Sequence, residues 1–88
     1  MTIEGKILSI KDESDKVFRK KTIHLRISHK ETAFIEYHGR KMDLINNAIV
    51  NDIVVVDVTL FGSISKKNGC QYNNLVAQES KIIGHESE

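Results

Sequence analysis

The chain of 88 residues lacks several residues that define particular classes of protein. It has no proline, no tryptophan and one cysteine, Cys70. A single cysteine excludes an internal disulfide, and the absence of proline permits long, uninterrupted β-strands. No apolar run reaches the length of about eighteen residues that a membrane-spanning helix needs. The amino-terminal residues also lack the pattern of a signal peptide, so we expect a cytoplasmic protein.

Motifs for catalysis and metal binding are missing as well. The sequence contains no glycine-rich phosphate loop, no nucleophile elbow and no recognisable pair of carboxylates. A single cysteine cannot complete a zinc motif, and the spacing of the four histidines is not that of a metal site: His24, His29, His38 and His85. We therefore expect no enzymatic activity, no metal and no cofactor.

The positive and negative charges nearly balance, but they are unevenly distributed along the chain. The net charge is only +1, yet residues 16–41 hold eight basic and two acidic residues, a net charge of +6. Residues 1–15 carry −2 and residues 42–88 carry −3. Concentrated positive charge raises the local concentration of a polyanion, so this segment indicates a nucleic-acid partner.

Apolar and polar residues alternate along much of the chain with the period of two that half-buried strands show. The pattern predicts strands at 2–12, 17–28, 32–38, 53–61 and 71–83, and a period of three at 40–48 predicts one short helix. Three strands, a helix and two strands predict an all-β fold, the five-stranded Greek-key barrel called the OB-fold. The rival SH3-like barrel lacks this helix. We expect one domain over residues 1–83 and a flexible tail at 84–88.

Parity along the strands predicts which side chains form the core. Gly5 and Gly62, inside strand patterns, are expected to mark bends or bulges where the barrel curls. Tyr37 is expected in the core, while Phe34 falls on the opposite face of the same strand. The other predicted core residues are Ile7, Ile23, Leu25, Ile27, Ile35, Leu44, Val54, Val56, Val58, Leu60 and Leu75.

A set of short motifs also follows a particular order along the chain. They are Gly5-Lys6-Ile7, Phe18-Arg19-Lys20-Lys21, Ile35-Glu36-Tyr37, Lys41-Met42-Asp43-Leu44, Asn51-Asp52-Ile53-Val54-Val55-Val56, Leu60-Phe61-Gly62 and Tyr72-Asn73-Asn74-Leu75-Val76-Ala77. Over residues 3–83 this set resembles a small bacterial family of uncharacterised single-domain OB-fold proteins. The resemblance implies binding of single-stranded DNA, by likeness to other OB-folds.

The chain departs from that family at two positions. Asn51 stands where the family has glycine, a replacement that works because asparagine tolerates a left-handed turn conformation. Gln71 precedes Tyr72 where the family has two aromatic residues, which removes one stacking platform.

Single-strand binding needs cations along the phosphates and aromatic faces on which bases stack. Residues on the non-core face of the second strand stand about 7 Å apart, close to the spacing of successive phosphates. The loops after strands one and four flank the binding face of an OB-fold, so their lysines are clamp candidates. The residues expected at the site are Phe18, Lys20, Lys21, His24, Arg26, Phe34, Arg40, Lys41, Lys66, Lys67 and Tyr72.

Plainer interpretations fit the same features. A basic strand can be a solvated face whose lysines deter edge-to-edge aggregation, and each aromatic ring can instead belong to the core. The small core also favours a homo-oligomer, a dimer first. We predict a protein that binds single-stranded nucleic acid, with DNA expected ahead of RNA. A protein-interaction or assembly module is the alternative.

Overall fold

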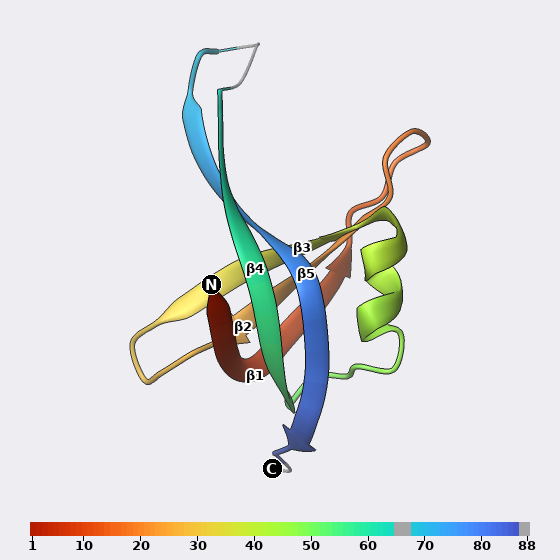
Figure 1. The fold of residues 1–88 in the computed structure, drawn as a ribbon, viewed down its shortest axis with the longest axis vertical. Coiled ribbons are helices and arrows are strands. Elements are labelled where there is room, and N and C mark those ends of the chain that lie inside the picture. The colour runs from red at the N-terminus through yellow and green to blue at the C-terminus, as the bar shows by residue number, and fades with distance from the viewer. Residues whose placement is uncertain (65–67, 87–88) are drawn as a thin grey trace.

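The computed structural model describes residues 1–64 and 68–86, except for the side chains of Ser63 and Tyr72. Five strands close into a barrel in the order β1-β2-β3-β5-β4, with one short 3₁₀ helix, η1, between β3 and β4 (Figure 1). The β3–β5 pair is parallel and the other pairs are antiparallel. This is the predicted OB-fold. The elements are β1 (Thr2–Asp12), β2 (Lys20–Arg26), β3 (Thr32–His38), η1 (Gly39–Ile45), β4 (Asp52–Ile64) and β5 (Gln71–His85).

Strand β1 closes the barrel because it pairs with two different neighbours. Its first half pairs with β4 and its second half with β2, and Lys6 has a partner in both. Next to this switch, a Cβ atom on Gly5 would lie 2.4 Å from the carbonyl oxygen of Arg26. Only glycine allows so close an approach of the two backbones, at the point where β1 passes from one partner to the other.

The bulges lie elsewhere than we expected. Gly62 pairs in unbroken register with Asn73, so the bulge predicted at Gly62 is wrong. The register shifts instead between Ile7 and Ser9 in β1, and at two places in the β4–β5 pair, where β5 carries the extra residue. Each shift adds local twist, which lets a short strand follow the curvature of the barrel.

The core contains most of the side chains that parity predicted. Leu44 and Leu75 are only partly buried, packed against it. Two predictions are wrong: Ile27 is 39% exposed and Leu60 is 57% exposed. Ile27 lies beyond the end of β2, and Leu60 lies where β4 has left the barrel, so neither has a covering layer. The buried hydrophobic residues are Ile7, Ile23, Leu25, Ile35, Tyr37, Met42, Ile45, Ala48, Val54, Val56, Val58, Val76 and Ala77.

Helix η1 contacts β2, β3 and β5 and buries Met42 and Ile45 against the core (Figure 1). Side chains three apart eclipse on a 3₁₀ helix, which explains the spacing of three in the sequence. The chain leaves this region through Asn51, whose φ of 76° is left-handed. The expected left-handed role of this asparagine is therefore confirmed.

A buried carboxylate ties the end of β5 to the start of β4. Asp52 accepts the backbone N–H of Ile49 at 3.0 Å, and its other oxygen lies 2.7 Å from Nδ1 of His85. These two contacts, the backbone one first, hold the pKa of Asp52 below its ordinary value. Strand β5 itself runs to His85, so residues 84 and 85 of the predicted tail belong to the strand.

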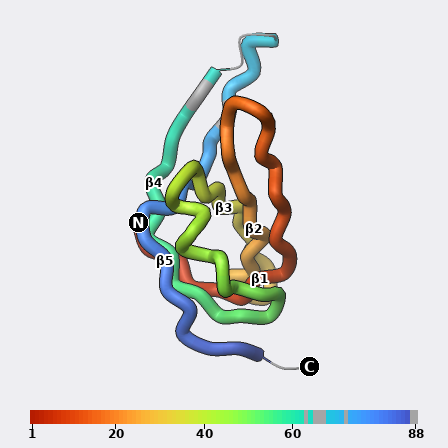
Figure 2. The backbone as a smooth tube through the Cα atoms, turned by 90° about the vertical axis from the view of Figure 1, so that its right-hand side faces the viewer, coloured from red at the N-terminus to blue at the C-terminus, as the bar shows by residue number. Residues whose placement is uncertain are grey.

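Two hairpins project from the same end of the barrel. One is the β1–β2 loop, residues 13–19, and the other is the β4–β5 arm, residues 59–64 with 71–74 (Figures 1 and 2). In the arm, β4 has passed its last partner on β1 and pairs with β5 alone. Among the described residues, no helix is long and apolar enough to cross a membrane.

Candidate nucleic-acid interface

The outer sides of β2 and β3 form one surface between the two projecting hairpins, here called the β2–β3 face. Register places the residues of this face in cross-strand pairs, because side chains of equal parity share one side of a sheet. The pairs are Lys20 with His38, Thr22 with Glu36, His24 with Phe34, and Arg26 with Thr32.

Two pairs of rings lie on this face. The rings of His24 and Phe34 are stacked, with centroids 4.4 Å apart and planes 12° apart. Phe18 meets His38 edge-to-face at 4.9 Å. Phe34 is 63% exposed and Phe18 is 46% exposed, so both keep ring surface open to solvent. The expected exposure of Phe34 is confirmed, and an exposed, braced ring is the platform that a nucleobase needs.

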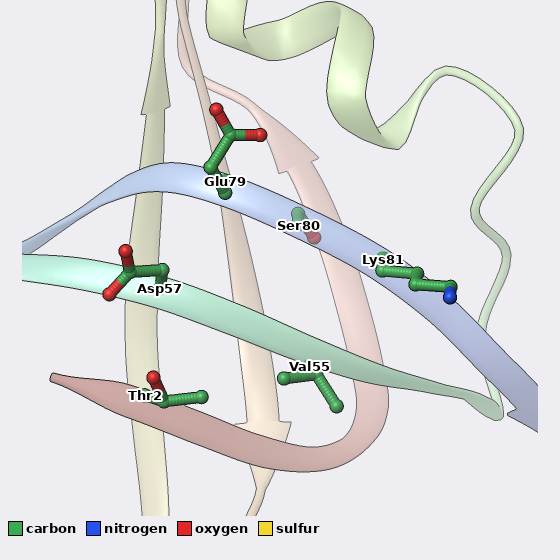
Figure 3. A pocket seen from close by; sticks show the side chains of 6 residues that line it. All are labelled: Thr2, Val55, Asp57, Glu79, Ser80 and Lys81. Atoms are coloured by element: carbon green, nitrogen blue, oxygen red, sulfur yellow. The ribbon is translucent and has the colours of Figure 1, made fainter.

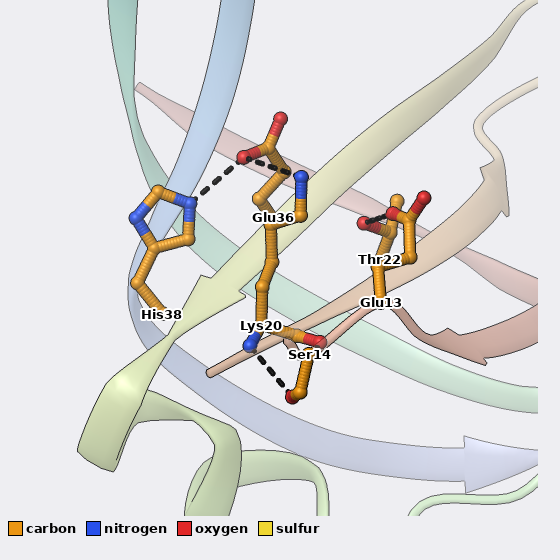
Figure 4. A network of polar contacts seen from close by, with 6 residues as sticks. All are labelled: Glu13, Ser14, Lys20, Thr22, Glu36 and His38. Carbon is orange, nitrogen blue, oxygen red and sulfur yellow. Dashed lines mark hydrogen bonds and ion pairs between the residues drawn. The ribbon is translucent and has the colours of Figure 1, made fainter. Parts of the chain in front are cut away.

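Acidic side chains interrupt the basic row that the sequence indicated. The Glu36 carboxylate lies 3.7 Å from Nζ of Lys20 and 2.8 Å from Nε2 of His38 (Figure 4). Further along, Thr22 donates its hydroxyl to Glu13 (Figure 4). Two cations of β2 lie on this face, Lys20 and Arg26. Lys20 is paired with Glu36, whereas Arg26 is exposed and has no ion pair among the described residues. The face is therefore mixed in charge, because cross-strand neighbours supply carboxylates beside the cations.

Hydrogen bonds within the β1–β2 loop hold Phe18 at the edge of the face. Asp15 accepts the backbone N–H groups of Val17 at 2.8 Å and Phe18 at 2.6 Å. These bonds, the one from Phe18 first, lower the pKa of Asp15. Ser14 accepts the backbone N–H of Lys20 at 2.9 Å (Figure 4). The loop is thus built to a fixed shape, although Phe18 precedes β2 rather than lying within it.

A hollow of about 170 Å³ opens on the same side of the barrel, where β1 joins the β2–β3 face. It lies between the stacked rings and the base of the β1–β2 loop. Its walls combine two aromatic rings, two hydroxyls, an ammonium and a carboxylate. The lining residues are Ser9, Lys11, Glu13, Thr22, His24 and Phe34.

The remaining predicted cations are dispersed. Lys21 is partly buried and shares the parity of the core residues of β2, so it does not lie on the β2–β3 face. Arg40 is exposed on η1, whereas Lys41 donates to the carbonyl of Gln78 on β5 at 2.8 Å. The structure thus gathers Phe18, Lys20, His24, Arg26 and Phe34 and leaves these three lysine and arginine residues apart. Lys66 and Lys67, and the Tyr72 side chain, lie outside the described residues.

Sequence reasoning missed several residues of this surface. Glu36 and His38 have the parity of Phe34, so alternation along β3 carried enough signal to place them. Alternation along a strand gave no such signal for Ser9, Lys11 and Glu13. They reach the site only through the β1–β2 register, which a bulge between Ile7 and Ser9 displaces.

A larger hollow, of about 520 Å³, lies on a different face formed by β1, β4 and β5 (Figure 3). Asp57, Glu79 and Lys81 are its charged residues, and Asp57 also lies 3.5 Å from the amino-terminal nitrogen. Two carboxylates and one lysine repel a polyanion more than they attract it. No group of three metal-ligating side chains occurs within residues 1–64 and 68–86.

Comparison with known proteins supports the fold. A crystal structure of mitochondrial single-stranded DNA binding protein from S. cerevisiae superposes with a TM-score of 0.67 at 13% identity. The match covers 99% of this chain and 96% of that one. No protein-family model and no curated protein matches the chain. At this identity the likeness establishes the barrel alone, and the resemblance to the small bacterial family stays a prediction.

Proposed function

We propose that this chain binds single-stranded nucleic acid, DNA ahead of RNA, with the bases lying on the β2–β3 face. The observation that carries the proposal is the stacked pair of His24 and Phe34, of which Phe34 is mostly exposed. An exposed apolar ring gains free energy when a ligand removes its face from water. Nucleobases do so without regard to sequence because every base has a π-face.

The charges of the face favour bases over phosphates at its centre. Glu36 offsets Lys20, and Glu13 stands beside Lys11, so a phosphate placed here gains little net attraction. Exposed cations instead stand at the margins: Arg26 at one end of β2, and Arg19 next to the other. A strand whose bases face the sheet and whose phosphates follow these margins satisfies both sets of charges. A duplex does not, because its bases are already stacked and paired.

The first test measures binding of fluorescently labelled single-stranded DNA, single-stranded RNA and duplex DNA of equal length at two salt concentrations. We expect single strands to bind more tightly than duplex. Affinity should fall as salt rises, because the cations of the protein displace counterions from the phosphates of the strand. Equal binding of duplex and single strands, or no binding at low salt, would contradict the proposal.

Phe34→Ala is the decisive variant. Stacking of a base on an aromatic ring contributes about 1–3 kcal/mol, so affinity should fall about 5- to 150-fold. The melting temperature should fall by no more than about 4–8 °C, because the ring is exposed and a stacked pair is worth about 1 kcal/mol. The matched control is Ile83→Ala, which shortens an exposed apolar side chain on a different strand, β5. This variant should bind as the parent does.

A second candidate function, assembly into homo-oligomers, is favoured by the β4–β5 arm. Leu60, Phe61 and Ile64 are all at least half exposed there, on the part of β4 that pairs with β5 alone. Light scattering at micromolar concentration should then report a species larger than the 10.0 kDa chain. A clean monomer would count against it.

We also propose that the chain acts by binding alone, without catalysis, in the cytoplasm.

A further inference from the structure

The hollow beside the stacked rings has a chemistry that generic strand binding does not require. A stacking platform needs only a ring and nearby cations. This hollow adds a carboxylate, Glu13, fixed by the hydroxyl of Thr22, together with the ammonium of Lys11 and the hydroxyl of Ser9. At about 170 Å³ it is smaller than the roughly 300–1,000 Å³ of sites for drug-sized ligands, which suits one ring system.

The Glu13 side chain acts only as an acceptor here. The hydrogen bond from Thr22 is the main cause that lowers the pKa of Glu13, and Lys20 and Lys11 lower it further. The group is therefore ionised at neutral pH, and an ionised carboxylate accepts hydrogen bonds and donates none. It attracts N–H groups and repels both phosphates and carbonyl oxygens.

We propose that this hollow receives one nucleobase and prefers a base with an exocyclic amino group, cytosine ahead of uracil or thymine. The inference rests on the proposed function, since it needs a strand on the β2–β3 face. Cytosine offers an amino group to Glu13 and ring acceptors to Lys11 and Ser9. Uracil and thymine instead present a carbonyl oxygen where cytosine has its amino group, and that oxygen faces the carboxylate.

The side chains around the hollow support a base rather than another small ligand. Phe34 and His24 supply a flat aromatic wall, and base recognition in single strands combines such stacking with hydrogen bonds to the edge of the base. Opposite charges on Glu13 and Lys11 match neighbouring donor and acceptor groups on one edge. Glu13 would repel a simple anion, and Lys11 would repel a simple cation.

The test compares oligo-dC with oligo-dU of equal length, at slightly alkaline pH so that cytosine stays neutral. These probes share backbone, ring size and lack of a methyl group. They differ at position 4, amino in cytosine and carbonyl in uracil, and at N3, an acceptor in cytosine and a donor in uracil. We expect oligo-dC to bind at least about 5-fold more tightly, the lower end of what one side-chain contact to a base edge gives. Equal affinities would overturn the inference and leave the proposed function standing. No binding of either probe, or of any single strand, would overturn both.

Two variants assign the preference to the carboxylate. Glu13→Gln keeps the size of the side chain, but its amide can both donate and accept hydrogen bonds. It can therefore bind either base, and the ratio of the affinities for oligo-dC and oligo-dU should fall toward one. Glu79→Gln makes the same change of charge on the face of β1, β4 and β5, and should keep the preference. If Glu13→Gln retained the full preference for oligo-dC, Glu13 would not read the base. Melting temperatures of both variants check that the barrel is intact.

Discussion

The pairing of Glu36 with Lys20 leads to a prediction of improved binding. Glu36→Gln removes a negative charge from the β2–β3 face and keeps the size and parity of the side chain. It also releases Lys20, whose ammonium lies 3.7 Å from the carboxylate in the parent. We therefore expect the variant to bind single strands more tightly than the parent at low salt.

The size of the effect follows from counterion release. One phosphate contact on a single strand changes the slope of log affinity against log salt by about −0.7. If the released Lys20 makes one such contact, the slope should steepen by about that amount. Over a fourfold rise in salt, the variant should then lose about 2.5-fold more affinity than the parent loses. Stability should fall by no more than about 1 kcal/mol, the usual worth of an ion pair near the surface.

Fluorescence anisotropy titrations at four or more salt concentrations measure the affinity and its dependence on salt. Glu79→Gln is the matched control, since it changes the net charge equally on the face of β1, β4 and β5. The reasoning would be refuted if Glu36→Gln and Glu79→Gln raised affinity equally, which would indicate a general charge effect. Weaker binding by a folded Glu36→Gln variant would refute it as well, because Glu36 would then contact the ligand.

Two further predictions concern the barrel itself. Gly5→Ala should lower the free energy of unfolding by about 1–3 kcal/mol, because its Cβ atom would lie 2.4 Å from the Arg26 carbonyl oxygen; chemical denaturation measures this, and an unchanged midpoint would disprove the close approach. Asp52→Asn should destabilise at neutral pH. The pKa of Asp52 is lowered in the folded state, so its contribution is present above the ordinary pKa of 3.8 and is lost as pH falls through the lowered value. Denaturation curves of parent and variant should therefore converge at acid pH, and a constant difference would argue against it.

Local periodicity determined most of the fold. Alternation placed all five strands, and a spacing of three marked the helix, because these patterns record which side chains turn inward. Parity also placed Tyr37 inside and Phe34 outside. It failed at Ile27 and Leu60, since parity gives the side of a strand on which a residue lies but not whether another layer covers it.

The character of the candidate site was decided by tertiary structure. The sequence indicates a segment of charge +6, and parity predicts a row of cations along one strand. Register then set Glu36 beside Lys20, and the bulged pairing of β1 with β2 brought Glu13 to Thr22. A net charge counted along the chain ignores cross-strand neighbours, and Coulomb interactions depend on distance in space. The sequence therefore determined where the strands and the exposed ring lie, and only the closed barrel decided that the centre of the face carries carboxylates and stacked rings rather than a track of cations.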